Sequence, residues 1–220
     1  MILCVDGVLT GADLTEARDA LAGVRWRDGQ RTAGWSARLV KHNAQSDSSD
    51  RAAQALAQRV LAKLEANALF KSAVRPSVFG PVFFNRYETG MEYGAHIDDA
   101  MMGGVRTDVS FTLFLDDPET YDGGELVIET SAGEFDYKLP AGAALIYPST
   151  TLHRVAPVTR GARRAFVGWA QSEVRSAERR ELLFDLDRAR RSLFEREGKS
   201  AEFDLLSKSH ANLVRMWAHD

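Results

Sequence analysis

The chain has little cysteine, no long apolar run and no excess of one charge sign. Cys4 is the single cysteine among 220 residues, so no internal disulfide can form, which is typical of a reducing compartment. Without an activating neighbour, Cys4 is expected to be a buried apolar filler. No stretch approaches the roughly 18 uninterrupted apolar residues of a membrane-spanning helix. The first residues include Asp6 and no basic segment, so no signal peptide is visible. We therefore expect a soluble cytoplasmic protein without a membrane partner.

The charges are balanced both overall and within the arginine-rich part of the chain. Lys and Arg number 28 and Asp and Glu number 31, which gives a formal net charge of -3. Residues 173–197 contain seven Arg and seven acidic residues. Asp187 precedes Arg190 and Arg191 at the i,i+3 and i,i+4 spacings that stabilise a solvated helix. We therefore expect no nucleic-acid partner.

Three segments differ in their pattern. Residues 1–75 are expected to form a mainly helical N-terminal flank, with a capping box at Thr10 and Asp13 and a second helix from about Arg51 to Phe70. Residues 76–172 read as short strands separated by turns. Residues 173–220 are expected to be a C-terminal helical extension that breaks near Gly198. The strands expected in the middle segment are 77–87, 108–115, 124–129, 135–139, 143–148 and 163–170.

Six strands without intervening helices favour an antiparallel arrangement over a parallel βαβ sheet. The predicted fold class is α+β. The strands suggest an antiparallel sandwich or a double-stranded β-helix (jelly roll), with N-terminal flanking helices and a C-terminal helical extension.

His96, Asp98 and His153 are the candidate metal ligands. On an extended segment the side chains of His96 and Asp98 point to the same side. His153 follows a later strand, and in a double-stranded barrel strands far apart in sequence meet at one open end. Two imidazoles and one carboxylate on one face are the arrangement of non-haem Fe(II) oxygenases.

Arg163 is the candidate anion-binding residue. It opens the strand RRAFVGWA ten residues after His153, and a buried guanidinium in a barrel is costly unless it meets an anion. Strand alternation puts Trp169 on the same face as Arg163 and turns Arg164 the other way.

Three runs of the sequence carry a resemblance to a known family. They are NRYETGMEYGAHIDDA, RTDVSFTLFLDDPETYDGGELVI and LPAGAALIYPSTTLHRVAPVTRGARRAFVGW. Together they resemble the Fe(II)- and 2-oxoglutarate-dependent dioxygenases, and among these the bacterial PKHD-type hydroxylases, an iron-uptake-associated branch related to the prolyl hydroxylases. The resemblance extends over nearly the whole chain.

The resemblance implies a reaction and a set of roles. The enzyme would hydroxylate a substrate with O2 while 2-oxoglutarate is decarboxylated to succinate and CO2, with L-ascorbate as a reductant. The substrate is left open between a prolyl or peptidyl group and a small molecule such as a siderophore component. The implied Fe(II) ligands are His96, Asp98 and His153. The implied 2-oxoglutarate residues are Arg163 and Tyr87, followed by Ser110, Phe114 and Trp169.

Several questions stay open at the level of sequence. Tyr93 is either a cavity-wall residue or core packing. The segment 39–47 is either a surface loop or a substrate contact through Lys41, His42 and Asn43. The same ligand set also suits a zinc hydrolase, and a non-catalytic jelly-roll binding module is a further alternative. The C-terminal helices either brace the barrel or form the interface of a homo-oligomer.

Overall fold

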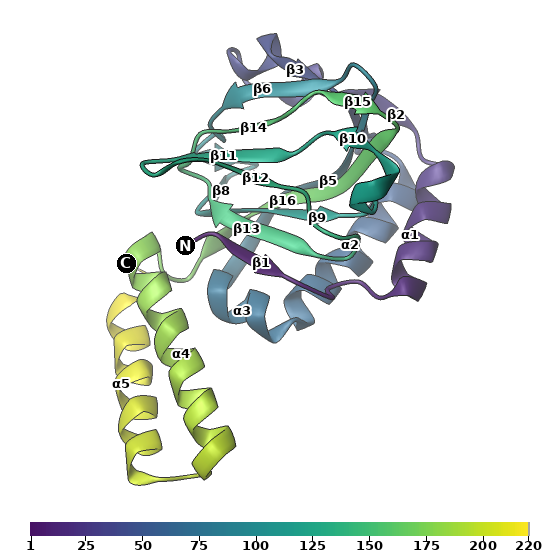
Figure 1. Cartoon of the computed structure of the whole chain (residues 1–220). Helices are drawn as coiled ribbons and strands as arrows, with labels where there is room; N and C mark the ends of the chain where they lie inside the picture. The colour runs from purple at the N-terminus through teal and green to yellow at the C-terminus, as the bar shows by residue number, and fades with distance from the viewer. Residues whose placement is uncertain (220) are drawn as a thin grey trace.

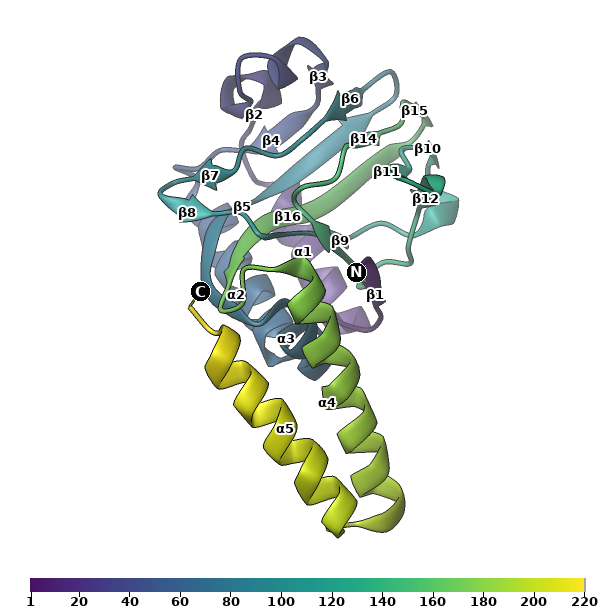
Figure 2. The same ribbon diagram turned by 90° about the vertical axis from the view of Figure 1, so that its left-hand side faces the viewer.

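Two antiparallel sheets face each other and form the body of the protein. The computed structural model describes residues 1–219. Helices α1, α2 and α3 cover the outer face of the larger sheet, and a hairpin of α4 and α5 projects from the body (Figures 1 and 2). This is the jelly roll with flanking helices that the sequence predicts.

The larger sheet has seven strands, and the strands that pair in it do so antiparallel. In spatial order they are β1 (Leu3–Val5), β13 (Ala144–Pro148), β9 (Val109–Phe114), β16 (Ala162–Ser172), β5 (Pro76–Glu88), β4 (Ala44–Ser46) and β2 (Trp26–Asp28).

The smaller sheet has five strands, and two short ribbons complete the strand set. Its strands in spatial order are β12 (Gly133–Tyr137), β11 (Leu126–Thr130), β14 (His153–Val155), β6 (Glu92–His96) and β3 (Lys41–His42). The ribbons pair β10 (Asp122–Gly123) with β15 (Val158–Arg160), and β7 (Met101–Met102) with β8 (Val105–Arg106).

The N-terminal flank contains more than helices. β1, β2, β3 and β4 come from residues 1–75 and lie in the two sheets, beside the helices of this segment. The expectation that Cys4 is buried was wrong: it lies on β1, at the edge of the larger sheet, and is exposed. Two short 3-10 turns also lie here, at Gly29–Thr32 and Ala37–Leu39.

Capping residues define where the flanking helices begin and end. α1 (Gly11–Ala22) begins after Thr10, whose side chain and that of Asp13 form the expected capping box. The prediction of a single helix from about Arg51 to Phe70 was wrong, because α2 (Arg51–Ala66) and α3 (Ala68–Val74) are separate helices. Asn67 has extended backbone angles, and its side chain caps α3 by accepting from Leu69 N and Phe70 N.

Two apolar cores follow from the alternation of side chains along the strands. On β9, Phe111 and Leu113 point outward into a core shared with α1, α2 and α3. Phe114 belongs to a second core between the two sheets, which includes Tyr87 and Ile128. Because both faces of β9 are covered, its polar residues on the inner face are buried and available for a site.

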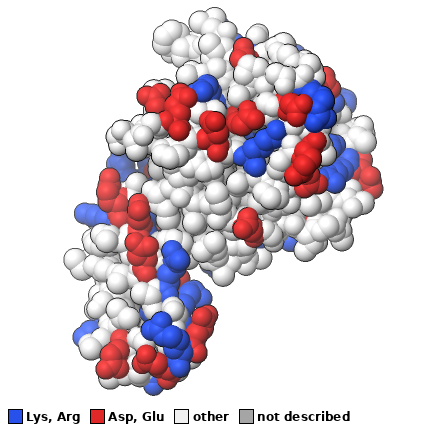
Figure 3. Space-filling model, viewed as in Figure 1, with Lys and Arg blue, Asp and Glu red and all other residues white. Residues whose placement is uncertain are grey.

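The C-terminal hairpin consists of α4 (Ala177–Glu197) and α5 (Ala201–Trp217), with the expected break at Gly198. Basic and acidic side chains are interspersed on the hairpin face shown in Figure 3. Four large apolar side chains of α4 and α5 are exposed: Leu182, Phe194, Leu205 and Met216. Among residues 1–219, no helix combines the length and the apolar character needed to cross a membrane.

Candidate metal centre and cleft

His96, Asp98 and His153 meet in space. β14 pairs with β6 so that His153 lies directly opposite His96, and Asp98 follows β6 by two residues. One candidate ligand atom from each of the three residues lies within 4.8 Å of the others. His153 Nε2 is 3.8 Å from Asp98 Oδ1. The geometry fits a divalent metal held by two imidazoles and one carboxylate.

Both imidazoles are oriented by backbone carbonyls. The Nδ1–H of His96 donates to Gly94 O at 2.8 Å, and the Nδ1–H of His153 donates to Thr151 O at 3.1 Å. Each Nε2 atom is therefore left with its lone pair for a ligand. Burial, and then the neighbouring His153, lower the pKa of His96 to about 4. At neutral pH this keeps His96 in the uncharged form that a metal requires.

The hydroxyl of Ser110 holds the carboxylate of Asp98. Ser110 Oγ donates to Asp98 Oδ2 at 2.6 Å and also contacts Ser149 Oγ at 2.7 Å. Ser110 lies on β9, so this contact ties the loop after β6 to the opposite sheet. One oxygen of Asp98 is thereby held, and Oδ1 faces the histidines.

Arg163 is a buried cation, and two of its three guanidinium nitrogens lack acceptors. Its side chain is 1% exposed, and its Nε and Nη1 have no hydrogen-bond partner among residues 1–219. The guanidinium carbon lies 5.4 Å from the ring centroid of Tyr87 and 5.1 Å from that of Phe114. Aromatic faces compensate a cation only in part, so the unmatched donors point to an anion, and a carboxylate fits their fork.

A cleft of about 850 Å³ connects Arg163 with the three candidate ligands. Strands of both sheets form its walls. The chain segment that runs from β2 to β4 and the hairpin of β7 and β8 also contribute. Tyr87, Tyr93, Asn43 and Trp169 line it. The Tyr93 ring stacks on His96, with ring centroids 3.5 Å apart.

Three other pocket candidates lie elsewhere. His42 is exposed on the outer side of β3 and does not line the cleft, because side chains alternate along the strand. Ser110 and Phe114 are fully buried behind the wall, where they contact Asp98 and Arg163. Arg164 points away from the cleft, as expected, and pairs with Asp116.

Sequence reasoning missed two residues of the site. Tyr147 lines the cleft and packs edge-on against His153, with ring centroids 5.1 Å apart. Burial raises its pKa well above the usual value, so it stays a neutral phenol. Ser149 contacts the hydroxyl of Ser110, which in turn donates to Asp98. Strand alternation over 143–148 could have put Tyr147 on the inner face, but nothing local distinguishes Ser149 from its neighbours.

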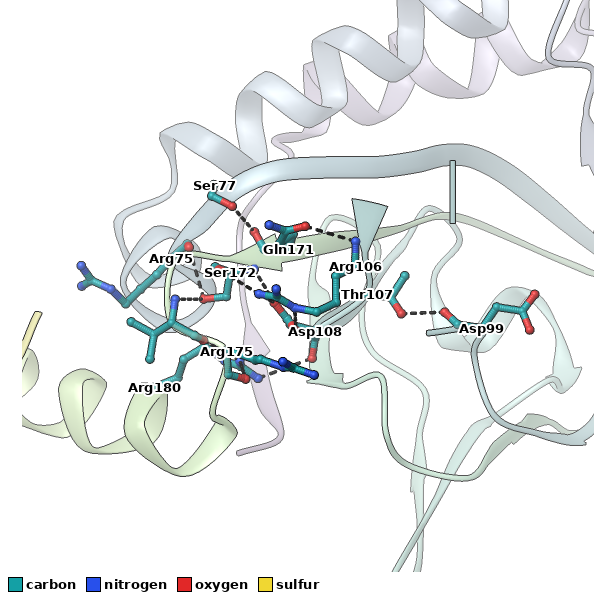
Figure 4. A network of polar contacts seen from close by, with 11 residues as sticks. Arg75, Ser77, Asp99, Arg106, Thr107, Asp108, Gln171, Ser172, Arg175 and Arg180 are labelled. Carbon is teal, nitrogen blue, oxygen red and sulfur yellow. Dashed lines mark hydrogen bonds and ion pairs between the residues drawn. The ribbon is translucent and has the colours of Figure 1, made fainter. Parts of the chain in front are cut away.

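A polar network joins the loop that carries Asp98 to helix α4 (Figure 4). Thr107 Oγ1 donates to Asp99 O at 2.6 Å. Next along the chain, the Asp108 carboxylate accepts from Arg106 and from Ser172 N. Arg180 of α4 is 5% exposed and donates to the carbonyls of Val174, Arg175 and Asp108. The C-terminal extension is thus connected to the loop beside the candidate metal centre.

Comparison with known protein families gives two matches along the chain. Residues 82–171 match the 2OG-Fe(II) oxygenase superfamily, and residues 178–219 match the PKHD-type hydroxylase C-terminal domain. A PKHD-type hydroxylase of Acaryochloris marina is 54% identical over 99% of this chain and 100% of its own length. One of Crocosphaera subtropica is 51% identical with the same coverage.

Solved structures with the same fold are more distant in sequence. A Pseudomonas putida prolyl-4-hydroxylase superposes with a TM-score of 0.54 at 19% identity, covering 77% of this chain and 92% of its own. A Trichoplax adhaerens prolyl hydroxylase, solved with a hypoxia-inducible-factor peptide, gives 0.55 at 14% identity, covering 78% and 84%. The alpha-ketoglutarate-dependent epimerase SnoN of nogalamycin biosynthesis gives 0.55 at 16%, covering 79% and 78%. Because a hydroxylase and an epimerase share this fold, these neighbours support the architecture alone.

Proposed function

The chain belongs to the PKHD-type hydroxylases, a family of 2-oxoglutarate-dependent dioxygenases, and from this premise we propose roles for its own residues. His96, Asp98 and His153 bind Fe(II). Arg163 binds the distal carboxylate of 2-oxoglutarate, and Tyr87 lies beside it. Family membership decides against the zinc hydrolase and the binding module considered from sequence.

One observation carries the proposal: a two-histidine, one-carboxylate cluster and a buried arginine with two unmatched guanidinium nitrogens share one cleft. When bound, Fe(II) would allow O2 to oxidise 2-oxoglutarate to succinate and CO2 and to convert a substrate C–H group to C–OH, with one oxygen atom of O2 going to each product.

The chain's own residues orient and shield this chemistry. The carbonyls of Gly94 and Thr151 set the imidazole orientation, and Ser110 sets that of Asp98. Tyr93 and Tyr147 pack on the imidazoles and limit the access of water. Burial raises the pKa of Tyr87 to about 12, so its phenol stays protonated and able to donate beside the cosubstrate.

The test is an anaerobic titration of metal-free protein with Fe(II) and 2-oxoglutarate, in which the visible absorption spectrum is recorded at each addition. We expect a weak charge-transfer band that His96→Ala abolishes, because it removes a ligand. We expect Arg163→Met to weaken 2-oxoglutarate binding by about 100-fold, the cost of leaving a buried charge unmatched.

Two matched variants serve as controls. His42→Ala removes an exposed imidazole, and Arg160→Met removes a guanidinium on the surface ribbon, where it pairs with Asp122. Both are expected to retain the band and the 2-oxoglutarate affinity. A band that survives His96→Ala, or no band in the parent protein, would contradict the proposed roles.

Finer parts of the function stay predictions. These are the use of L-ascorbate, the cytoplasmic location, the homo-oligomer and the choice between a peptidyl substrate and a small molecule. Once the band is established, succinate release in air allows candidate substrates to be screened.

A further inference from the structure

A second buried cation faces the cleft. Lys41 lies on β3, is 6% exposed and lines the same cleft as Arg163. Among residues 1–219 its ammonium has no carboxylate within ion-pairing distance, and its hydrogen-bond partner is Thr32 Oγ1, at a long 3.4 Å. Burying an ammonium without an anion costs free energy. The buried ammonium of Lys41 therefore points to a ligand that supplies the anion.

The surroundings of Lys41 leave its charge unmatched. Its Nζ lies 4.9 Å from the ring centroid of Tyr93, the residue that stacks on His96. Asp98 and Asp28 favour the charged form from a distance, but burial has the larger effect and lowers its pKa to about 8. The charge of Asp98 is also committed to the metal under the proposed function. Lys41 is therefore mostly charged at neutral pH and lacks an anion of its own.

A second unmatched polar group lies two residues further along. Asn43 is 3% exposed and lines the cleft; its Nδ2 and Oδ1 make no hydrogen bond of good geometry among residues 1–219, and the Tyr87 hydroxyl is a polar neighbour of its amide. Lys41 and Asn43 face inward while His42 between them is exposed. A buried cation without an anion and a buried amide with hydrogen-bonding capacity to spare form a polar subsite on the wall of the cleft.

The cation of this subsite is not needed to bind the cosubstrate. Under the proposed function, the two carboxylates of 2-oxoglutarate are accounted for by Arg163 and by the metal. Arg27, another cation of the cleft wall, is paired with Asp47, and Arg31 is exposed. Lys41 is thus the buried cation that remains for a second anion.

We propose that the primary substrate carries a carboxylate, which Lys41 binds, and an adjacent hydrogen-bonding group, which Asn43 binds. This inference rests on the proposed function and narrows its substrate class. The carboxylate belongs either to a free small acid or to an acidic residue of a peptide, and the test has one arm for each source.

The experiment uses the full chain loaded with Zn(II) and 2-oxoglutarate, so that the metal and Arg163 are occupied and no turnover occurs. Ligand-observed NMR measures the binding of N-acetylglycine against N-acetylglycinamide, and of a blocked Ala-Asp-Ala peptide against blocked Ala-Asn-Ala. In at least one of these two pairs, we expect the carboxylate compound to bind about tenfold more tightly than its amide. This ratio corresponds to the free energy of one charge-assisted hydrogen bond.

Variants assign this preference to a residue. We expect Lys41→Met to abolish it, Lys41→Arg to keep part of it, and Arg31→Met to leave it unchanged. Arg31→Met is the matched control, because it removes one positive charge from an exposed position of the same cleft. Removing an unmatched buried charge should also raise the melting temperature of ligand-free Lys41→Met, whereas a structural role for Lys41 would lower it.

The outcomes are distinguishable. Binding of both amides as tightly as the acids, no binding in either arm, or a preference that persists in Lys41→Met overturns the inference. If Lys41→Met weakens the binding of 2-oxoglutarate as strongly as Arg163→Met does, Lys41 belongs to the cosubstrate and the inference is wrong. Failure of the proposed function would be seen earlier, as a protein that does not bind 2-oxoglutarate at all.

Discussion

At the scale of single residues, the site depends on groups that hold other groups in place. Neither imidazole is free to rotate, because Gly94 and Thr151 each accept one ring N–H. The carboxylate of Asp98 is held in the same way by Ser110. Such supporting contacts determine how well a ligand set matches its metal before the metal arrives.

Ser110→Ala is expected to weaken Fe(II) binding by about tenfold, because Asp98 loses the donor that fixes one of its oxygens. The measurement is a competition titration with a metal-binding dye. Ser149→Ala is the matched control: it removes the neighbouring hydroxyl but leaves the contact of Ser110 with Asp98, so a smaller loss is expected. Equal affinity in Ser110→Ala and the parent chain would contradict a supporting role for Ser110.

At the scale of secondary-structure elements, short turns position the buried arginine. The GGEL turn between β10 and β11 passes directly against Arg163. Gly124 has φ +68°, and a Cβ there would lie 3.1 Å from Arg163 Cδ and 3.0 Å from Val158 Cγ2. Glycine is required both for the backbone conformation and for the close approach.

Gly124→Ala is therefore expected to lower the free energy of unfolding by about 2 kcal/mol and to weaken 2-oxoglutarate binding by displacing Arg163. Gly90→Ala is the matched control, since Gly90 has φ +86° and open space around its Cβ. It should lose about 1 kcal/mol through the backbone alone. Denaturant unfolding measures the free energy of unfolding, and the charge-transfer titration measures the affinity for 2-oxoglutarate. Unchanged cosubstrate affinity in Gly124→Ala would show that the turn does not position the arginine.

At the scale of the whole molecule, the projecting hairpin is connected to the site through the packing of α4 on the body. Arg180 donates to three carbonyls, and one of them, Asp108 O, also accepts from Ser149 N. Ser149 in turn contacts Ser110, the donor to Asp98. A continuous set of hydrogen bonds thus leads from the C-terminal extension to a candidate metal ligand.

Arg180→Met is expected to lower the free energy of unfolding by about 3 kcal/mol, because buried carbonyls lose their donor. A loss of Fe(II) affinity beyond that of the control would show that the hairpin also supports the metal centre. The control is Arg196→Met, near the tip of the hairpin, where the arginine contacts Ser192 and is exposed. Thermal unfolding measures the stability of each variant, and metal titration measures its Fe(II) affinity. Equal stability in the two variants would contradict the role of Arg180.

The sequence by itself determined the features that depend on neighbouring residues. The capping box at Thr10, the break at Gly198 and the inward face shared by Arg163 and Trp169 follow from local hydrogen bonding and strand alternation. The pairing of His96 with His153 was inferable only because a jelly roll brings its strand ends together. The resemblance to a family made that fold the premise of the prediction.

Only the tertiary structure decided which side chains meet across strands. The inward direction of Lys41 and the outward direction of His42 depend on the pairing of β3 with β6, which a polar sequence does not specify. The contacts of Ser149 and Arg180 join residues that are far apart along the chain. Their partners were set by the packing of the two sheets and α4, because long-range contacts form only where the whole fold brings complementary groups together.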